Sequence, residues 1–282
     1  MRPWIATASL TLLLCGCAAH GADRARMSFS RTAGRVVALI PSFADDLYAV
    51  GAGDQLVAVS AYTDVARAKG LPRVADASSV DVEEIVALRP SAVIGIPAQA
   101  RFVEPLRRAH VPVFLLADDS YDAIFANLRA VGEITGHRRE AEAEIARLRR
   151  ETAALQRRTS GFARRPSVFV VLGSGPIWTA GAKSYISELI ELAGGRNAAG
   201  NLPAAYGEYS AEALLRDQPD LLVTDPATHL DALADREPWR SLRAVRLRRV
   251  YAIDPDVLER PGPSYNEAVR RLLERIAPLA QR

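Results

Sequence analysis

Short apolar runs alternate along the chain with longer segments in which apolar residues recur every three or four positions. Runs of four or five apolar residues without polar alternation are typical of strands that are covered on both faces, and helices between such strands produce a parallel sheet. The runs lie at 36–40, 56–60, 92–96, 112–116, 168–172, 221–224 and 250–253. The pattern therefore predicts an α/β fold with mostly parallel sheets and flanking helices.

The second half of the chain repeats the first. Segment 81–94 aligns with segment 210–223, and each copy has a candidate helix N-cap, a Glu two residues later, an apolar pair, a Pro and an apolar run. An N-cap side chain satisfies free N–H groups in the first helical turn, and a Glu there is favoured by the helix dipole. Glu83 and Glu212 are thus expected at equivalent, exposed positions.

A helix, a Pro and a strand could recur by chance in any α/β protein, so further matches between the two halves are needed as evidence of a duplication. The run at 36–40 is matched by 168–172, and segment 111–119 by 248–256. These matched segments extend the duplication through both halves of the chain. We therefore predict two similar lobes, each a mostly parallel sheet with flanking helices.

Two helical segments separate the lobes. Residues 121–135 have an amphipathic pattern, and residues 138–158 are rich in Ala, Glu, Arg and Leu without Gly or Pro. Such a composition has high helix propensity, and a helix of this length spans about 30 Å. A flexible connection would need Gly, Ser or disorder, so we predict one long rigid helix between the lobes.

The N-terminus resembles an export signal. Its apolar stretch at 5–14 is too short to span a bilayer, and it ends in Leu14-Cys-Gly-Cys17, which resembles the lipobox of bacterial lipoproteins. Cleavage before Cys17 would leave that residue to be acylated. The chain has 2 Cys in total and both lie here, so the mature protein cannot form an internal disulfide. We expect an exported protein, anchored by lipid on the periplasmic or cell-surface side of an inner or outer membrane.

The predicted organisation follows from these segments. It comprises a signal peptide at 1–16, a tether at 17–34, an N-terminal lobe at 35–119, linker helices at 120–160 and a C-terminal lobe at 161–282.

Composition and charge exclude some classes of function. The chain has 282 residues, 49% hydrophobic and 6% aromatic, as expected for a globular α/β protein. Its net charge is +3, with Arg scattered among acidic residues and without a basic stripe interleaved with aromatics. We therefore do not expect nucleic-acid binding.

Catalytic and metal-binding motifs are poorly supported. Gly51-Ala-Gly53 follows a helix rather than a strand, so it is interpreted as a helix C-cap and not as a dinucleotide-binding loop. The histidines at 110, 137 and 229 form no ligand-spaced cluster, and Gly173-Ser-Gly175 lacks the full nucleophile motif. We predict no catalytic residue, no metal site and no cofactor. A lipoprotein hydrolase is the alternative from another class.

Motifs spread over the mature chain point to a family. They are Arg35-Val-Val-Ala-Leu-Ile-Pro-Ser42, Leu47-Tyr-Ala-Val-Gly-Ala-Gly-Asp54, Val59-Ser-Ala-Tyr-Thr-Asp64, Leu71-Pro-Arg-Val74, Glu84-Ile-Val-Ala-Leu-Arg-Pro90, Thr179-Ala-Gly181, Glu191-Leu-Ala-Gly-Gly195 and Leu258-Glu-Arg-Pro-Gly-Pro263. With an export signal, two lobes and one long helix, the chain resembles the cobalamin and iron-siderophore class of ABC-transporter substrate-binding proteins.

The resemblance implies a ligand between the lobes, beyond the carboxyl ends of the strands. The ligand is expected to be cobalamin or a cobinamide, with a ferric siderophore or haem as alternatives. The implied ligand-binding residues, all expected on loops that point toward the ligand, are Ser42, Phe43, Tyr62, Trp178, Tyr206 and Arg260. The aromatic rings would stack on a flat corrin, although each could instead be a packing residue. Arg260 could instead form a local ion pair with Glu259.

The resemblance also implies partners. Glu83 and Glu212 are expected to dock the two lobes onto a two-fold symmetric ABC permease, which works with its ATPase. The alternative is that both glutamates only favour the helix dipole. We expect the protein itself to be a monomer.

Overall fold

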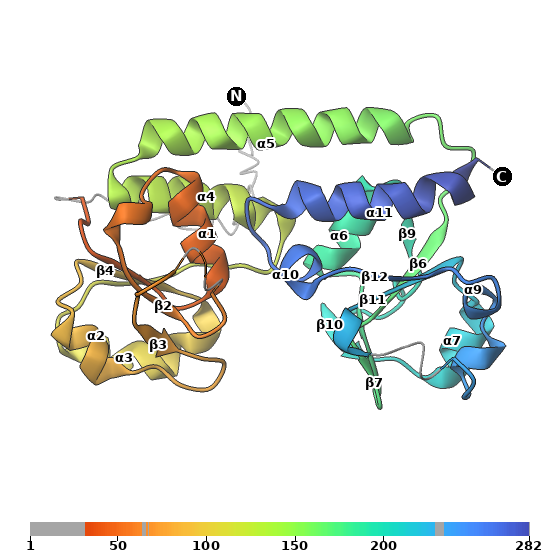
Figure 1. Ribbon diagram of the computed structural model, residues 1–282, viewed down its shortest axis with the longest axis horizontal. Coiled ribbons are helices and arrows are strands. Elements are labelled where there is room, and N and C mark those ends of the chain that lie inside the picture. The colour runs from red at the N-terminus through yellow and green to blue at the C-terminus, as the bar shows by residue number, and fades with distance from the viewer. Residues whose placement is uncertain (1–31, 64–65, 67, 229–233, 282) are drawn as a thin grey trace, which may run out of the picture. The chain divides into compact units, whose positions relative to one another are not determined.

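The computed structural model describes residues 32–63, 66, 68–228 and 234–281. From residue 31 onward the chain forms one compact unit (Figure 1). The signal peptide, the tether and Cys17 lie outside the described residues. No helix among those described is both long and apolar enough to cross a membrane.

The first lobe contains a five-stranded parallel sheet with strand order β3-β2-β1-β4-β5 (Figure 1). Its strands are β1 (Val36–Ala38), β2 (Leu56–Ser60), β3 (Arg73–Ala75), β4 (Ala92–Gly95) and β5 (Val113–Leu115). Its helices are α1 (Pro41–Ala49), α2 (Val82–Ala87), α3 (Ala100–Arg108) and α4 (Tyr121–Thr135), with short 3-10 turns η1 (Gly53–Gln55) and η2 (Pro97–Gln99). The strands carry the buried core of this lobe, as the apolar runs predict.

The second lobe contains a four-stranded parallel sheet and a small antiparallel sheet. The parallel sheet has order β12-β11-β6-β9 and consists of β6 (Ser167–Val171), β9 (Arg196–Asn197), β11 (Leu221–Thr224) and β12 (Val250–Ala252). The antiparallel sheet has order β10-β8-β7 and consists of β7 (Gly173–Ser174), β8 (Ile177–Ala180) and β10 (Tyr206–Glu208). The sequence analysis did not predict this small sheet.

The helices of the second lobe flank these sheets. They are α6 (Tyr185–Leu192), α7 (Ala211–Asp217), α9 (Arg243–Arg246), α10 (Pro255–Leu258) and α11 (Tyr265–Ala280), with 3-10 turns η3 (Pro226–Thr228) and η4 (Trp239–Ser241).

The duplication predicted from the sequence is confirmed by the strand order. β4 and β5 follow β1 across the first sheet in the same order in which β11 and β12 follow β6 across the second. The helices before β4 and β11 also begin alike. Asp81 Oδ1 accepts a hydrogen bond from the Glu84 N–H at 2.9 Å, and Ser210 Oγ accepts one from the Ala213 N–H at 3.0 Å.

A long helix, α5 (Arg138–Thr159), joins the lobes, close to its predicted bounds. It packs against α4 of the first lobe and α11 of the second (Figure 1). Within the predicted linker 120–160, α4 packs against α1 of the first lobe and also contacts α6 of the second, whereas α5 runs along both lobes.

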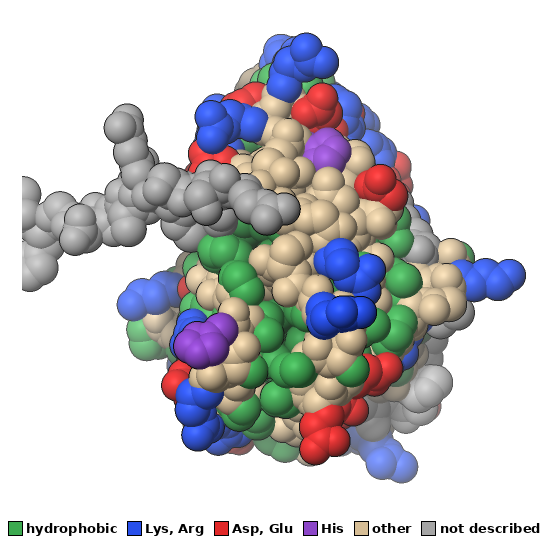
Figure 2. Space-filling view, turned by 90° about the vertical axis from the view of Figure 1, so that its left-hand side faces the viewer, with side chains coloured by type: hydrophobic (Ala, Val, Ile, Leu, Met, Phe, Trp, Pro, Cys, Tyr) green, Lys and Arg blue, Asp and Glu red, His purple; other side chains and the backbone are tan. Residues whose placement is uncertain are grey.

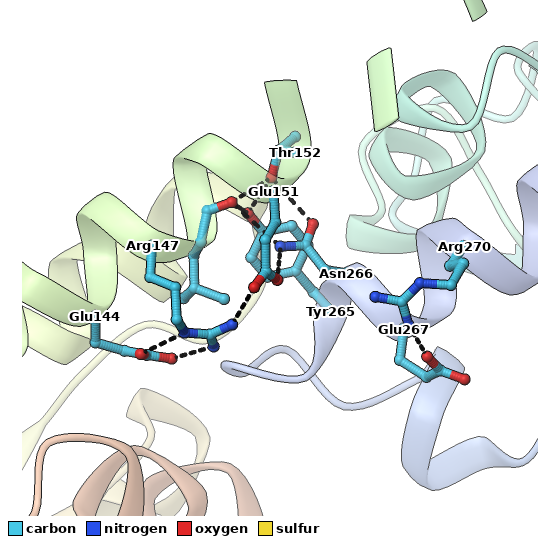
Figure 3. Close-up of polar contacts among 9 residues, drawn as sticks. Glu144, Arg147, Glu151, Thr152, Tyr265, Asn266, Glu267 and Arg270 are labelled. Carbon is cyan, nitrogen blue, oxygen red and sulfur yellow. Dashed lines mark hydrogen bonds and ion pairs between the residues drawn. The ribbon is translucent and has the colours of Figure 1, made fainter. Parts of the chain in front are cut away.

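Polar side chains fix α5 against the start of α11 (Figure 3). The Thr152 hydroxyl bonds to the Tyr265 hydroxyl and donates to Asn266 Oδ1 at 3.0 Å. Asn266 Nδ2 donates to the Leu148 carbonyl and to Glu151 Oε2, both at 3.2 Å. Because these groups are buried or partly buried, breaking one bond would leave a polar atom unsatisfied, and the network specifies how α11 meets α5.

The outer face of the first lobe has acidic and basic side chains interspersed (Figure 2). This mixture agrees with the small net charge of the chain.

Candidate ligand-binding cleft

The carboxyl ends of the strands of both lobes meet at the junction. In a parallel sheet these ends share one edge, so α1, the turn at Tyr62 and the loop at Asp118 all follow the same edge of the first sheet. An ion pair connects this edge to the second lobe, since Arg260 Nη1 lies 3.4 Å from Asp45 Oδ2.

Trp178 and Tyr206 stand on one face of the antiparallel sheet. Trp178 on β8 pairs with Glu208 on β10, and Tyr206 pairs with Ala180, so the two aromatic residues are diagonal cross-strand neighbours. Diagonal neighbours project on the same side and lie within reach of aromatic rings. Trp178 is 44% exposed and Tyr206 40% exposed, so together they form an uncovered aromatic platform.

The opposite face of the same sheet is anchored in the lobe. The side chain of Thr179, between Trp178 and Ala180, is fully buried, and its hydroxyl donates to the Val170 carbonyl at 2.6 Å. The platform therefore rests on β6 of the parallel sheet. We expected Trp178 and Tyr206 on loops. They lie instead on strands, which hold the two rings in a fixed relation.

Tyr62 offers a third exposed ring, from the first lobe. It is 60% exposed and lies in the turn after β2. Arg73 holds this turn, since its Nη1 donates to the carbonyls of Ser60 and Thr63 at 2.9 and 2.8 Å. The ring is thus presented to solvent from a fixed backbone.

Carboxylates surround Tyr206. Burial, together with the charges of Glu259, Asp118 and Asp119, raises the pKa of the Tyr206 hydroxyl to about 12. Burial and the charge of Asp119 raise the pKa of Asp118 to about 6. Burial and the charge of Asp225 raise the pKa of Glu259 above its usual range. The charged groups that raise these three pKa values are all acidic.

Tyr121 and Tyr265 form a second group of aromatic rings, with ring centroids 5.1 Å apart. The Tyr121 N–H donates to Glu188 Oε2 at 2.6 Å, and the hydroxyls of Tyr121 and Tyr265 are 3.3 Å apart. Tyr185 is completely buried, and its hydroxyl has no hydrogen-bond partner among the described residues. Burial and the neighbouring Tyr206, Tyr265 and Glu188 raise the pKa of Tyr185 well above its usual range. The hydroxyls of Tyr185 and Tyr206 are therefore neutral at neutral pH.

The structure corrects the prediction for Phe43. Phe43 has no exposed surface, because α1 begins at Pro41 and places Phe43 with Leu47 on its buried face. Its ring packs inside the first lobe and cannot contact a ligand in this conformation. Ser42 is also buried, and its Oγ has no hydrogen-bond partner within the described part of the chain. Gly262 of the second lobe lies close to it, because a Cβ atom at Gly262 would be 3.9 Å from Ser42 Cβ. Ser42 therefore lies against the second lobe.

Arg260 is engaged by protein side chains, although we expected it to contact the ligand. Its side chain is only 14% exposed and pairs with Asp45 of the first lobe and Asp256 of α10, rather than with Glu259 as the alternative held. Arg260 and Asp45 also line a cavity of about 490 Å³ together with Arg147 of α5. In this structure Arg260 connects the lobes.

Glu83 and Glu212 lie where the repeat predicts. Each is exposed in the first turn of its helix, α2 or α7. Both helices lie on the side of the molecule away from α5 (Figure 1). Val86, one turn after Glu83, is 39% exposed.

Comparison with known proteins defines the family. The family model for periplasmic binding proteins matches residues 36–257. The vitamin B12-binding protein of Vibrio cholerae is 30% identical over 84% of this chain and 87% of that protein. The ABC transporter substrate-binding lipoprotein YvrC of Bacillus subtilis, itself uncharacterized, is 27% identical over 86% of this chain and 80% of its own length. The chain belongs to the periplasmic binding protein family.

Solved structures of similar proteins agree with this family assignment. The vitamin B12-binding protein BtuF of Vibrio cholerae superimposes with a TM-score of 0.76 at 28% identity, covering 89% of this chain and 98% of that one. The haem-binding protein RhuT from Roseiflexus has a TM-score of 0.75 at 26% identity, covering 88% and 99%. The predicted resemblance to the cobalamin and iron-siderophore class of substrate-binding proteins is thus confirmed, and the named relatives are binding proteins rather than enzymes. In the part of the chain that the structure describes, no His, Cys, Asp and Glu side chains are grouped to hold a metal ion.

Proposed function

We propose that this protein is the lipid-anchored substrate-binding component of an ABC importer, and that it binds cobalamin or a related corrinoid between its lobes. The observation that carries the proposal is the exposed aromatic platform of Trp178 and Tyr206 at the carboxyl edge of the second lobe. A corrin is a large flat ring, and aromatic side chains provide extensive contact area for it. The vitamin B12-binding relatives support this choice of ligand.

Haem is the second candidate, supported by the similarity to a haem-binding protein. Haem iron needs an axial ligand, and a tyrosine binds it as tyrosinate. Partial burial and the charges of Glu259, Asp118 and Asp119 raise the pKa of Tyr206 to about 12 and so disfavour the tyrosinate form. We therefore rank haem below a corrinoid. A ferric siderophore remains the other alternative.

The test uses the exported protein carrying Cys17→Ser, so that it can be purified without detergent. The protein is mixed with cyanocobalamin, haemin or a ferric siderophore, desalted, and its visible spectrum recorded. We expect the corrinoid to be retained, and calorimetry then gives its affinity. Retention of haemin or a siderophore with loss of the corrinoid would assign the other ligand class. Retention of no chelate would contradict the proposed function.

Delivery of the ligand needs a docking surface for the permease. We propose that Glu83 and Glu212 provide it, one on each lobe. Both are exposed and equivalent in the repeat. An isologous permease dimer presents the same patch twice, so two equivalent acidic positions suit it.

A further inference from the structure

Arginine is concentrated at the outer end of the second lobe. Segment 236–249 contains six arginines and one acidic residue, a formal charge of +5, which leaves −2 for the rest of a chain whose total is +3. The segment includes η4 and α9 and ends directly before β12. In Figure 1, α9 lies at the end of the second lobe that is farthest from the first lobe. The small net charge of the whole chain thus conceals a strongly basic region.

Two carboxylates near this segment are already paired with arginines. Asp220 is buried and is shared, since its Oδ1 lies 2.7 Å from Arg243 Nη2 and its Oδ2 lies 3.0 Å from Arg164 Nη1. Glu237 Oε1 lies 2.6 Å from Arg240 Nε. These two carboxylates therefore do not neutralise the other arginines of the segment.

The turn after α9 presents the other arginines around an exposed leucine. Arg246 and Arg248 are exposed and flank Leu247, which is 51% exposed. The N–H groups of Arg248 and Arg249 donate to carbonyls of α9 at 3.0 and 2.8 Å, so the backbone of the turn is held in place. Arg246, Arg248 and Arg249 form no ion pair with another described residue. The turn thus offers unpaired cations and apolar surface together.

A hollow of about 430 Å³ adjoins this turn, between the edge strand β12 and the last part of α11. Arg249 and Arg275 line it, with Glu274 as the acid among the lining residues. The guanidinium carbon of Arg275 lies 4.6 Å from the ring centroid of Tyr251. The apolar lining consists of Leu247, Tyr251, Pro278 and Leu279. We call Arg246, Leu247, Arg248, Arg249 and Arg275 the arginine surface.

Resting on the lipid anchor of the proposed function, we propose that the arginine surface lies against the anionic phospholipid headgroups of the membrane that holds the anchor. The arginine fork binds phosphate oxygens, and apolar side chains among cations favour the boundary between headgroups and acyl chains. Residues 17–31 reach at most about 50 Å when fully extended, so an anchored protein stays close to that membrane. This confinement raises the effective concentration, and a weak contact is then sufficient.

The test measures binding of the protein carrying Cys17→Ser, which lacks the acyl chains, to lipid vesicles. The vesicles contain phosphatidylcholine alone or phosphatidylcholine mixed with phosphatidylglycerol, and co-sedimentation at low ionic strength gives the bound fraction. We expect at least about tenfold tighter binding to the anionic vesicles, since each arginine near an anionic surface strengthens binding about fivefold. Added salt should reduce this preference, and at physiological salt the contact alone should not retain the unanchored protein.

A triple variant locates the contact. Arg246→Gln, Arg248→Gln and Arg249→Gln together should remove most of the preference for anionic vesicles. Thermal melting checks that the triple variant is folded. If it is not, Arg246→Gln combined with Arg275→Gln should reduce the preference instead.

The matched control removes three exposed arginines of equal total charge, with Arg89→Gln, Arg108→Gln and Arg139→Gln. Arg89 suits this control because, like Arg248, it has a positive φ and lies two residues after the end of a helix. The control should keep the preference for anionic vesicles.

Three results would overturn the proposal. The first is equal binding to neutral and anionic vesicles, or a preference that the control reduces as much as the triple variant does. The second is stronger competition by inorganic phosphate than by chloride at equal ionic strength, which would assign the hollow to a free anion. The third is a triple variant that keeps the vesicle preference but loses transporter binding in neutral-lipid nanodiscs, which would assign the surface to a protein partner.

These results are separate from a failure of the proposed function. The substituted arginines lie outside the candidate cleft, so the same preparations should retain cyanocobalamin whether or not they bind vesicles. Loss of the corrinoid by the unsubstituted cleft contradicts the proposed ligand, and the vesicle experiment is unaffected.

Discussion

At the scale of residues, exposed side chains and buried side chains of the same type have different roles. Trp178, Tyr206 and Tyr62 are exposed where lobes of this kind leave a cleft, whereas Tyr185 and Tyr265 are buried beneath it. An aromatic ring that is half-exposed on a strand can contact a ligand without local unfolding of the protein. The exposed rings are therefore the positions where substitution separates binding from stability.

Truncating the platform should weaken ligand binding and leave the fold unchanged. Trp178→Ala and Tyr206→Ala each remove a half-exposed ring, so we expect losses of about 1–3 kcal/mol in binding free energy of cyanocobalamin. Tyr62→Ala tests the first lobe in the same way. Calorimetry measures the binding free energy, and thermal melting measures the stability of each variant. Leu247→Ala, which removes a 51% exposed side chain elsewhere, is the control and should change neither. Unchanged affinity in all three aromatic variants would make these rings packing residues.

Arg260 should contribute to the stability of the empty protein. Arg260→Ala leaves the partly buried Asp45 without this partner, and we expect a loss of about 1–3 kcal/mol in the free energy of unfolding. The check is a double-mutant cycle with Asp45→Asn, measured by denaturant unfolding without ligand. A coupling energy near zero would show that the pair does not connect the lobes. As a matched control, Arg271→Ala breaks an exposed helical pair with Glu267 and should cost less than 1 kcal/mol.

At the scale of elements, the duplication explains why two helices begin alike. The caps at Asp81 and Ser210 fix the first turns of α2 and α7, and these turns present Glu83 and Glu212. Only the helix start has to be conserved between the lobes to keep this equivalence. The remaining loops of the two lobes are free to differ.

Reversing the charge of both glutamates should abolish docking. With Glu83→Lys and Glu212→Lys, we expect ligand affinity to be unchanged and the melting temperature nearly so, since each Lys costs typically under 1 kcal/mol at a helix start. Binding to the cognate transporter in lipid nanodiscs should be lost, because like charges across an interface cost several kcal/mol. Glu104→Lys with Glu140→Lys is the control of equal charge and should dock normally. Normal docking and uptake by the first double variant would leave the two glutamates a purely structural role.

At the scale of the whole molecule, α5 runs from one lobe to the other, and buried hydrogen bonds fix it to α11 (Figure 3). The residue that would attach this molecule to a membrane lies outside the described part, at Cys17.

Replacing Cys17 should release the protein from the membrane. A single acyl chain binds a membrane weakly, whereas several chains on one cysteine anchor it firmly. Cys17→Ser removes the attachment site, so we expect the protein in the soluble extracytoplasmic fraction after cell fractionation. Cys15→Ser is the matched control and should remain with the membrane. Membrane association of the Cys17→Ser protein would point to an uncleaved signal segment.

The sequence determined the repeated units, because apolar periodicity and caps are local properties. The predicted runs 56–60 and 221–224 coincide with β2 and β11, and residues 121–135 with α4. The matched Glu83 and Glu212 followed from the same local rules.

Only the tertiary structure decided how distant segments combine into a cleft. Trp178 and Tyr206 were expected on loops, whereas they lie on the short strands β8 and β10, whose pairing is set by segments distant from the main strand runs. The sequence analysis also offered Phe43 as a ligand contact, and the start of α1 at Pro41 buried that ring. The effect of distant carboxylates on Tyr206 could not be predicted for the same reason. Asp118 and Glu259 are ordinary loop residues until folding brings both to Tyr206, since electrostatic potential depends on distance in space and not along the chain.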